Sequence, residues 1–148
     1  MIVEAQISIK SNRTAVWSAI TNIQQAAEVF TSIEKTELLN EPVQGLVGIK
    51  WRETRLYYGK PATIEKWITD AIENESFTSR AEMDGFIFLT RMSISENGNQ
   101  VIVTSTHETR SQGLMAAIKS LPMIFFKTML KKAILKDLND LKTTLEKK

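Results

Sequence analysis

A broad apolar stripe runs along the last third of the chain, from Gly113 to Glu146. Its members recur every three or four residues, the period of a helix face turned toward a core. They are Leu114, Ile118, Leu121, Phe125, Phe126, Met129, Leu130, Ile134, Leu138, Leu141 and Leu145. The stripe predicts one long C-terminal helix, with a kink or a fresh start near Ser120 because Pro122 removes a backbone hydrogen bond. At ~1.5 Å per residue, this helix would be about 50 Å long and needs a large apolar surface to lie against.

Alternating and short helical patterns precede that stripe. Residues 2–9 alternate between apolar and polar, which predicts a strand with one wet face. Ser11 and Asn12 then supply an N-cap for a short helix whose inner face includes Trp17, and residues 23–30 form a second short helix. Neither helix is long enough to be stable alone, so we expect both to close one end of a sheet, with Trp17 in the core.

Six further strands are expected between the short helices and the C-terminal stripe. Their ranges are 33–39, 46–57, 62–71, 77–83, 86–95 and 101–109. Asp84-Gly85 and Asn97-Gly98 are two-residue hairpin signals, and Gly48 inside the second range suggests a bulge. Because all connections are short, the strands should form an antiparallel meander. The fold class is therefore α+β: a curved antiparallel sheet of about seven strands wrapped on a long C-terminal helix.

Composition narrows the classes of function. The 148 residues fit one domain, 1–148, and the formal net charge of +2 gives no case for binding nucleic acid. There is no cysteine and only one histidine, His107, so thiolate or multi-histidine metal sites are excluded and no metal or cofactor is expected. Neither a signal peptide nor an apolar membrane span is evident, which favours a cytoplasmic protein without stable membrane insertion.

The order of elements, together with four local segments, resembles the START-like (SRPBCC) superfamily, which includes polyketide cyclase/dehydrase-like and birch-pollen-allergen-like proteins. The segments are SNRTAVWSAITN, GLVGIKWRET, NQVIVTSTHETR and ILKDLNDLKTTLE. The resemblance spans nearly the whole chain and departs at Asn12, where many relatives have proline. It implies a helix-grip fold with a hydrophobic cavity between sheet and helix. Relatives bind lipids, sterols, quinones or hormones, cyclise polyketides, or activate a chaperone ATPase, and no motif selects among these.

Two charged residues share a strand face with an apolar wall. By period two, Glu53 and Arg55 lie on the same face as Ile49 and Trp51. If that face lines the cavity, the pair could orient the polar head of a ligand. The alternative is a salt bridge at a solvent-exposed strand end, worth ~0–1 kcal/mol.

The single histidine is a weak catalytic candidate. His107 follows Val103 and Ser105 on one strand face, and a histidine near neutral pKa could act as the general base of an aldol-type cyclisation. No second group that would orient it is evident from the sequence. The alternative is a strand-end histidine making one hydrogen bond.

The expected ligand-binding residues combine the strand face with the helix stripe. They are Ile49, Trp51, Glu53, Phe126, Met129 and Leu130. Methionine and aromatic side chains adapt to varied apolar ligands, although the same residues would also serve as ordinary core. The lysines along the helix could attract an anionic membrane or an acidic partner, or could form a solvated helix face.

Three functions remain open. The first is a carrier or sensor of a small hydrophobic molecule, the second a polyketide cyclase or aromatase using His107, Glu53 and Arg55, and the third a protein-interaction module. A large cavity with a buried charge pair would favour the enzyme, a dry cavity the carrier, and a filled core the interaction module. The oligomeric state and the ligand are left open by the sequence.

Overall fold

The computed structural model describes residues 1–41, 44–57, 59–111 and 123–147. The elements are β1 (Ile2–Ile9), α1 (Arg13–Thr21), η1 (Ile23–Gln25), α2 (Ala26–Val29), β2 (Ile33–Leu38), β3 (Lys50–Tyr57), β4 (Lys60–Ile72), β5 (Ser76–Met83), β6 (Phe86–Asn97), β7 (Gln100–Ser111) and α4 (Met123–Glu146). This order confirms the α+β class. The first part of the predicted stripe and the expected kink near Ser120 lie outside the described residues.

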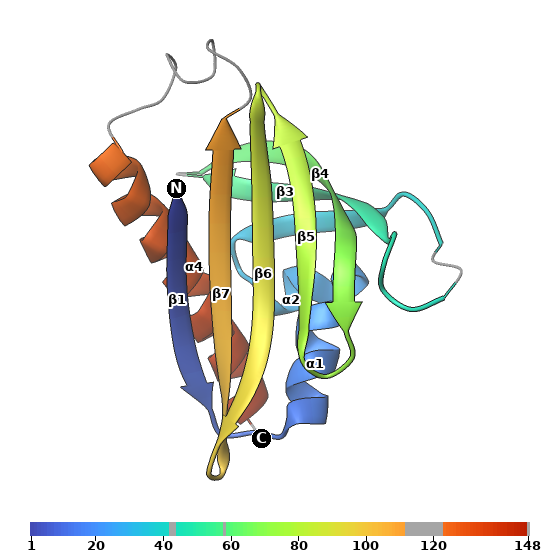
Figure 1. The fold of residues 1–148 in the computed structure, drawn as a ribbon, viewed down its shortest axis with the longest axis vertical. Helices are drawn as coiled ribbons and strands as arrows, with labels where there is room; N and C mark the ends of the chain where they lie inside the picture. Colours follow the sequence, from blue (N-terminus) through green and yellow to red (C-terminus); the bar gives the residue numbers. More distant parts are fainter. Residues whose placement is uncertain (42–43, 58, 112–122, 148) are drawn as a thin grey trace.

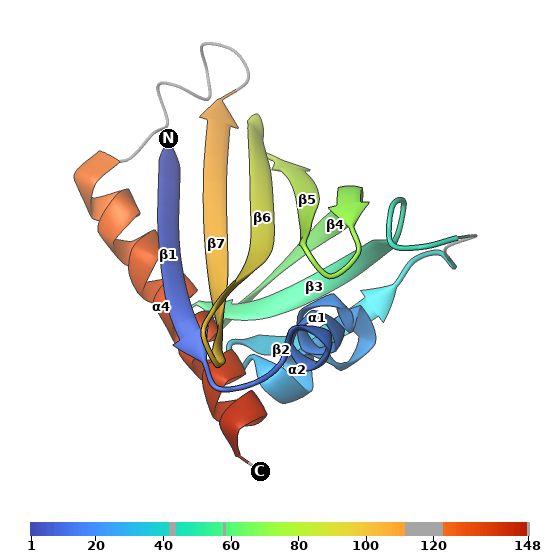
Figure 2. The same cartoon turned by 60° about the horizontal axis from the view of Figure 1, so that its bottom comes forward.

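The strands form one antiparallel sheet in the order β1-β7-β6-β5-β4-β3-β2. Only the connection after β1 leaves the meander, because α1, η1 and α2 carry the chain across to the opposite edge. Figures 1 and 2 show that β2 and β3 cross at a steep angle to β5, β6 and β7, and that β4 curves from the one direction to the other, so the sheet is strongly bent. Helix α4 runs along the inner side of the bend, beside β1.

Hairpin chemistry fixes the register of the central strands. Asp84 (φ 53°) and Gly85 (φ 81°) both adopt the left-handed conformation that a tight two-residue β-turn requires. The β5–β6 hairpin is therefore confirmed. Gly48 was expected within a strand, but β3 begins only at Lys50, and Gly48 (φ 94°) lies in the loop before it. Its positive φ explains the glycine without any strand bulge.

The core fills the end of the bend nearest α1. Ile134, Leu138 and Leu141 of α4 are at most 2% exposed there. Trp17 of α1 is 9% exposed and meets Phe77 edge-on, with ring centroids 6.0 Å apart. The expectation that Trp17 is a core residue agrees with this packing. The inner, or concave, face of the sheet is the face these side chains cover.

Candidate functional site: a buried charge cluster on the concave face

Strand β3 brings charged side chains into the interior. Ile49, just before it, is 8% exposed, Trp51 is 4% exposed, and Glu53 is 4% exposed on the same face. The side chain of Arg55, the next residue on that face, is 19% exposed. The strand end thus faces α4, and the charged pair lies inside the molecule.

Glu53 is the centre of an ion-pair network. Its Oε2 accepts hydrogen bonds from Arg55 Nε at 2.6 Å and from Lys66 Nζ of β4 at 3.1 Å. Its Oε1 accepts one from the indole Nε1 of Trp51 at 3.3 Å. Burial alone would raise the pKa of Glu53, but Lys66 and Arg55 outweigh it and lower the pKa to about 2. Glu53 is therefore a fixed negative charge that holds two cations in place.

Asp137 joins the network from the helix. Arg55 Nη1 lies 2.9 Å from Asp137 Oδ2, so one guanidinium bridges β3 and α4. The other carboxylate oxygen, Oδ1, is buried and has no hydrogen-bond partner among the described residues. Burial raises the pKa of Asp137 despite the Arg55 cation. This carboxylate is therefore more basic than an ordinary aspartate and has a free acceptor oxygen.

His107 faces the same interior from β7. Its Nε2 lies 2.9 Å from Ser105 Oγ. Burial, together with the positive charges of Lys66 and Arg55, lowers the pKa of His107 to about 3. The imidazole is neutral at physiological pH and is a weak base, so its chemistry here is hydrogen bonding.

A belt of hydroxyl side chains continues from His107 across the sheet. Partners in an antiparallel ladder share a face, and the register pairs His107 with Thr90 of β6 and Thr90 with Ser79 of β5. Ser79 and Ser105 are 6% and 3% exposed. With the charge cluster, these residues make the middle of the concave face polar, where a sheet that only packs on a helix would be apolar.

Apolar side chains flank this polar belt on both sides. Toward α1 lies the core around Phe77. Toward the opposite end, β6 places Phe86 and Phe88 on the same face, with ring centroids 6.1 Å apart, and both are only half-buried. The arrangement is two apolar regions separated by fixed charges and hydroxyls.

The helix residues predicted for the site have different outcomes. Leu130 is half-buried and packs against the core cluster. Met129 is 46% exposed, so the expectation that it lines the interior does not fit its position, because the helix turns that side of the stripe to solvent. The side chain of Phe126 lies outside those the structure describes.

Two members of the cluster, Lys66 and Asp137, were not singled out from the sequence. Lys66 stands opposite Trp51 in the β3–β4 ladder, on the face shared by Ile64 and Ile68. Asp137 lies among the lysines of the helix in sequence and is polar, so the pattern alone gives it no place in the interior. Its spacing of three from Ile134 and four to Leu141 matches the apolar stripe, and that spacing was the available signal.

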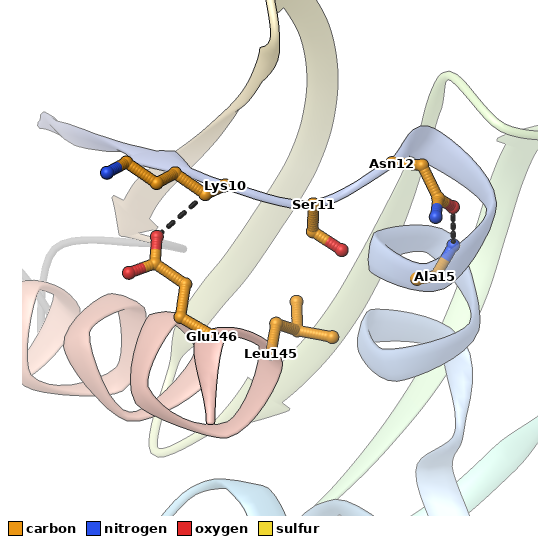
Figure 3. Close-up of a pocket in the computed structure, with 6 residues that line it drawn as sticks. All are labelled: Lys10, Ser11, Asn12, Ala15, Leu145 and Glu146. Atoms are coloured by element: carbon orange, nitrogen blue, oxygen red, sulfur yellow. Dashed lines mark hydrogen bonds between the residues drawn. The ribbon is translucent and has the colours of Figure 1, made fainter. Parts of the chain in front are cut away.

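A surface groove of about 470 Å³ lies elsewhere, between the start of α1 and the end of α4. Figure 3 shows Asn12 capping α1 at Ala15 and Lys10 donating its backbone N–H to Glu146 at 2.8 Å. None of the concave-face residues lines this groove. Its polar contacts are fully explained by helix capping and by the attachment of the end of α4 to β1.

Neither a metal-ligand cluster nor a membrane-spanning helix occurs in the described part of the chain. Residues 1–41, 44–57, 59–111 and 123–147 contain no group of three or more His, Cys, Asp or Glu side chains arranged to hold a metal ion. Within those same residues, no helix is long and apolar enough to span a membrane.

Comparison with known proteins shows the fold. No protein-family model and no curated protein sequence matches the chain. Among solved structures, a START superfamily protein from Mycobacterium smegmatis superposes with a TM-score of 0.83 at 12% identity, covering 99% of this chain and 97% of that one. The Zhui aromatase/cyclase from Streptomyces sp. R1128 gives 0.76 at 18% identity, covering 99% and 94%. Ginseng major latex-like protein 151 from Panax ginseng gives 0.76 at 15% identity, covering 99% and 97%.

The chain thus has the helix-grip fold of the START-like, or SRPBCC, superfamily. A bent seven-stranded antiparallel sheet grips a long C-terminal helix, as the sequence resemblance implied. At identities this low, the likeness establishes architecture, and the site has to be interpreted from its own residues.

Proposed function

We propose that this chain binds a small, mainly apolar molecule that carries oxygen-containing groups, on the concave face of the sheet beneath α4. The observation that carries the proposal is the buried polar belt centred on Glu53, Arg55 and Lys66. Buried ion pairs stabilise a fold little better than apolar residues of the same volume. Stability alone therefore gives no reason for them, whereas ligand sites typically combine apolar walls with a few fixed polar groups.

The chemistry of the belt indicates the class of ligand. Arg55 and Lys66 are cations suited to carbonyl, carboxylate or phenolate oxygens. Asp137 Oδ1 is an acceptor for a ligand hydroxyl, and Trp51 and Leu130 supply apolar walls. A hydrocarbon without oxygen would make no hydrogen bond to these polar groups, so we expect weak binding of plain alkanes.

Filling the apolar wall should remove binding. We expect wild-type protein to bind 1-anilinonaphthalene-8-sulfonate or oleate at about one site per chain with ~micromolar affinity, near −8 kcal/mol. Leu130→Trp should weaken this binding by more than about tenfold, because the larger side chain would occupy part of the proposed site. Isothermal titration calorimetry measures both the number of sites and the affinity.

Leu135→Trp is the matched control, since Leu135 lies on the same helix but is 36% exposed. It should bind within about twofold of wild type, as expected for a surface change. Absence of saturable binding in wild type, or equal binding by the Leu130→Trp protein, would contradict the proposal.

A second candidate, an aromatase/cyclase, is favoured by one specific observation. Asp137 combines a raised pKa with a buried oxygen, Oδ1, that has no hydrogen-bond partner among the described residues. Its other oxygen, Oδ2, lies 2.9 Å from Arg55 Nη1. In an aldol-type ring closure, a base removes a proton from carbon next to a carbonyl, and a cation stabilises the enolate oxygen that forms. Asp137 would be the base and Arg55 the stabilising cation, while neutral His107 would position the chain by hydrogen bonding.

The two candidates differ in what becomes of the bound molecule. A carrier releases it unchanged, whereas a cyclase converts a poly-β-ketone into an aromatic product that is visible by chromatography and ultraviolet absorption. In the enzyme, Asp137→Asn should retain binding and lose conversion. Native mass spectrometry of protein purified from its own host identifies any co-purified ligand, which is then the first molecule to test for conversion.

A further inference from the structure

The charges of α4 are distributed against the helix dipole. Its basic residues in the range 127–136 are Lys127, Lys131, Lys132 and Lys136, whereas its acidic residues, Asp137, Asp140 and Glu146, all follow. No aspartate or glutamate occurs from residue 109 to residue 136. Helix stability favours the reverse order, because the N-terminal end of a helix dipole is positive. The distribution is therefore not explained by stability of the helix.

Three of these lysines are exposed and form no ion pair with the described residues. Lys127, Lys131 and Lys132 are exposed and have no ion-pair partner among the described residues. Lys136 differs, since it pairs with Asp140 at 3.4 Å. These three lysines therefore present to solvent a positive charge that no ion pair with a described residue compensates.

Exposed apolar side chains lie close in sequence to the three lysines. Met129 is 46% exposed and Leu135 is 36% exposed. The start of α4 lies at the same end of the molecule as the start of β1, as both ribbon views show, and Ile2, the first residue of β1, is 59% exposed. Lysines and exposed apolar side chains thus occur together at one end.

We propose that the lysine patch, defined as Lys127, Met129, Lys131, Lys132 and Leu135, docks on the surface of an anionic phospholipid bilayer. Each lysine near such a surface attracts acidic head groups, and its long alkyl stem and the neighbouring Met129 and Leu135 enter the interfacial layer. A nucleic acid would favour arginine and stacking aromatic side chains, which are absent from this patch. The patch is separate from the concave-face cluster, so the proposal stands independently of the proposed ligand.

Co-sedimentation with phospholipid vesicles tests this proposal. Wild-type protein should bind vesicles of phosphatidylcholine and phosphatidylserine in a ratio of about 7:3 at least tenfold more tightly than pure phosphatidylcholine vesicles. Raising the salt from about 0.05 M to about 0.5 M should remove most of the binding, because screening shortens the reach of the lysine charges. Changing Lys127, Lys131 and Lys132 together to glutamate should weaken binding about 100-fold, from roughly fivefold for each lysine.

A charge-matched triple variant provides the control. Lys10→Glu, Lys35→Glu and Lys147→Glu change three exposed lysines outside the patch, and this protein should retain binding within about threefold. Equal losses in the two triple variants would overturn the proposal, because binding would then follow net charge alone. So would equal binding of both vesicle types, or binding to a single-stranded oligonucleotide as tight as that to the acidic vesicles.

The double variant Met129→Ser with Leu135→Ser tests whether the apolar side chains enter the membrane. It should weaken vesicle binding severalfold at high salt, where the lysine charges are screened. Unchanged binding would contradict insertion of Met129 and Leu135.

Discussion

Glu53→Gln should destabilise the protein by about 3–5 kcal/mol, the range expected when one partner of a buried ion pair is removed. The carboxylate of Glu53 accepts hydrogen bonds from Arg55, Lys66 and Trp51, and its side chain is only 6% exposed. Without its charge, two interior cations would share Asp137 as their remaining anion within the described cluster. Chemical denaturation followed by circular dichroism measures the change in unfolding free energy.

A surface variant and a double variant make this result specific. Glu65→Gln removes a half-exposed carboxylate that lies 3.7 Å from Arg52, and it should cost no more than about 0.5 kcal/mol. Adding Lys66→Gln to Glu53→Gln removes one of the uncompensated cations and should recover at least about 1 kcal/mol. A loss below about 1 kcal/mol in Glu53→Gln would show that the cluster is not buried as described.

Trp17→Ala should cost about 3–5 kcal/mol, as large aromatic deletions from a core do. Trp17 connects α1 to the sheet through its edge-on contact with Phe77, and α1 has only nine residues. A helix this short depends on packing for its stability, so loss of the indole also weakens the attachment of α1. Thermal unfolding should shift downward by many degrees.

Trp67→Ala is the comparison for that variant. Trp67 is half-buried, and the ammonium of Lys50 lies 5.8 Å from its ring centroid. Its loss should cost clearly less than that of Trp17, about 1–2 kcal/mol. If Trp17→Ala retained wild-type thermal stability, α1 would not close the sheet as described.

The architecture could be predicted because its determinants are local. Alternation in residues 2–9 and the turn at Asp84-Gly85 specify strands and a hairpin within a few residues of sequence. The period of two also placed Glu53 and Arg55 on the face of Trp51. What the period could not show was whether that face meets α4 or solvent, since this depends on the bend of the whole sheet.

The complete cluster depends on contacts between distant segments. Lys66 meets Glu53 through the β3–β4 register, and Asp137 meets Arg55 through the rotation of α4 against the sheet. The apolar stripe did not fix that rotation, because it is wide enough to include Met129, which is exposed, together with Leu130, which is half-buried. Neutral His107 is likewise a consequence of its burial and of the cations Lys66 and Arg55, which lie far away in sequence.

Ligand binding beside the charge cluster is tested most directly by the indole N–H resonances of the three tryptophans. Trp51 donates to Glu53 inside the proposed site, whereas Trp17 lies in the core near α1 and Trp67 packs with Lys50. In a titration of ¹⁵N-labelled protein with 1-anilinonaphthalene-8-sulfonate, the Trp51 resonance should shift saturably, with the affinity measured by calorimetry, while those of Trp17 and Trp67 stay nearly unchanged. Saturable binding that leaves the Trp51 resonance unmoved, or that shifts Trp67 instead, would contradict a site on the concave face.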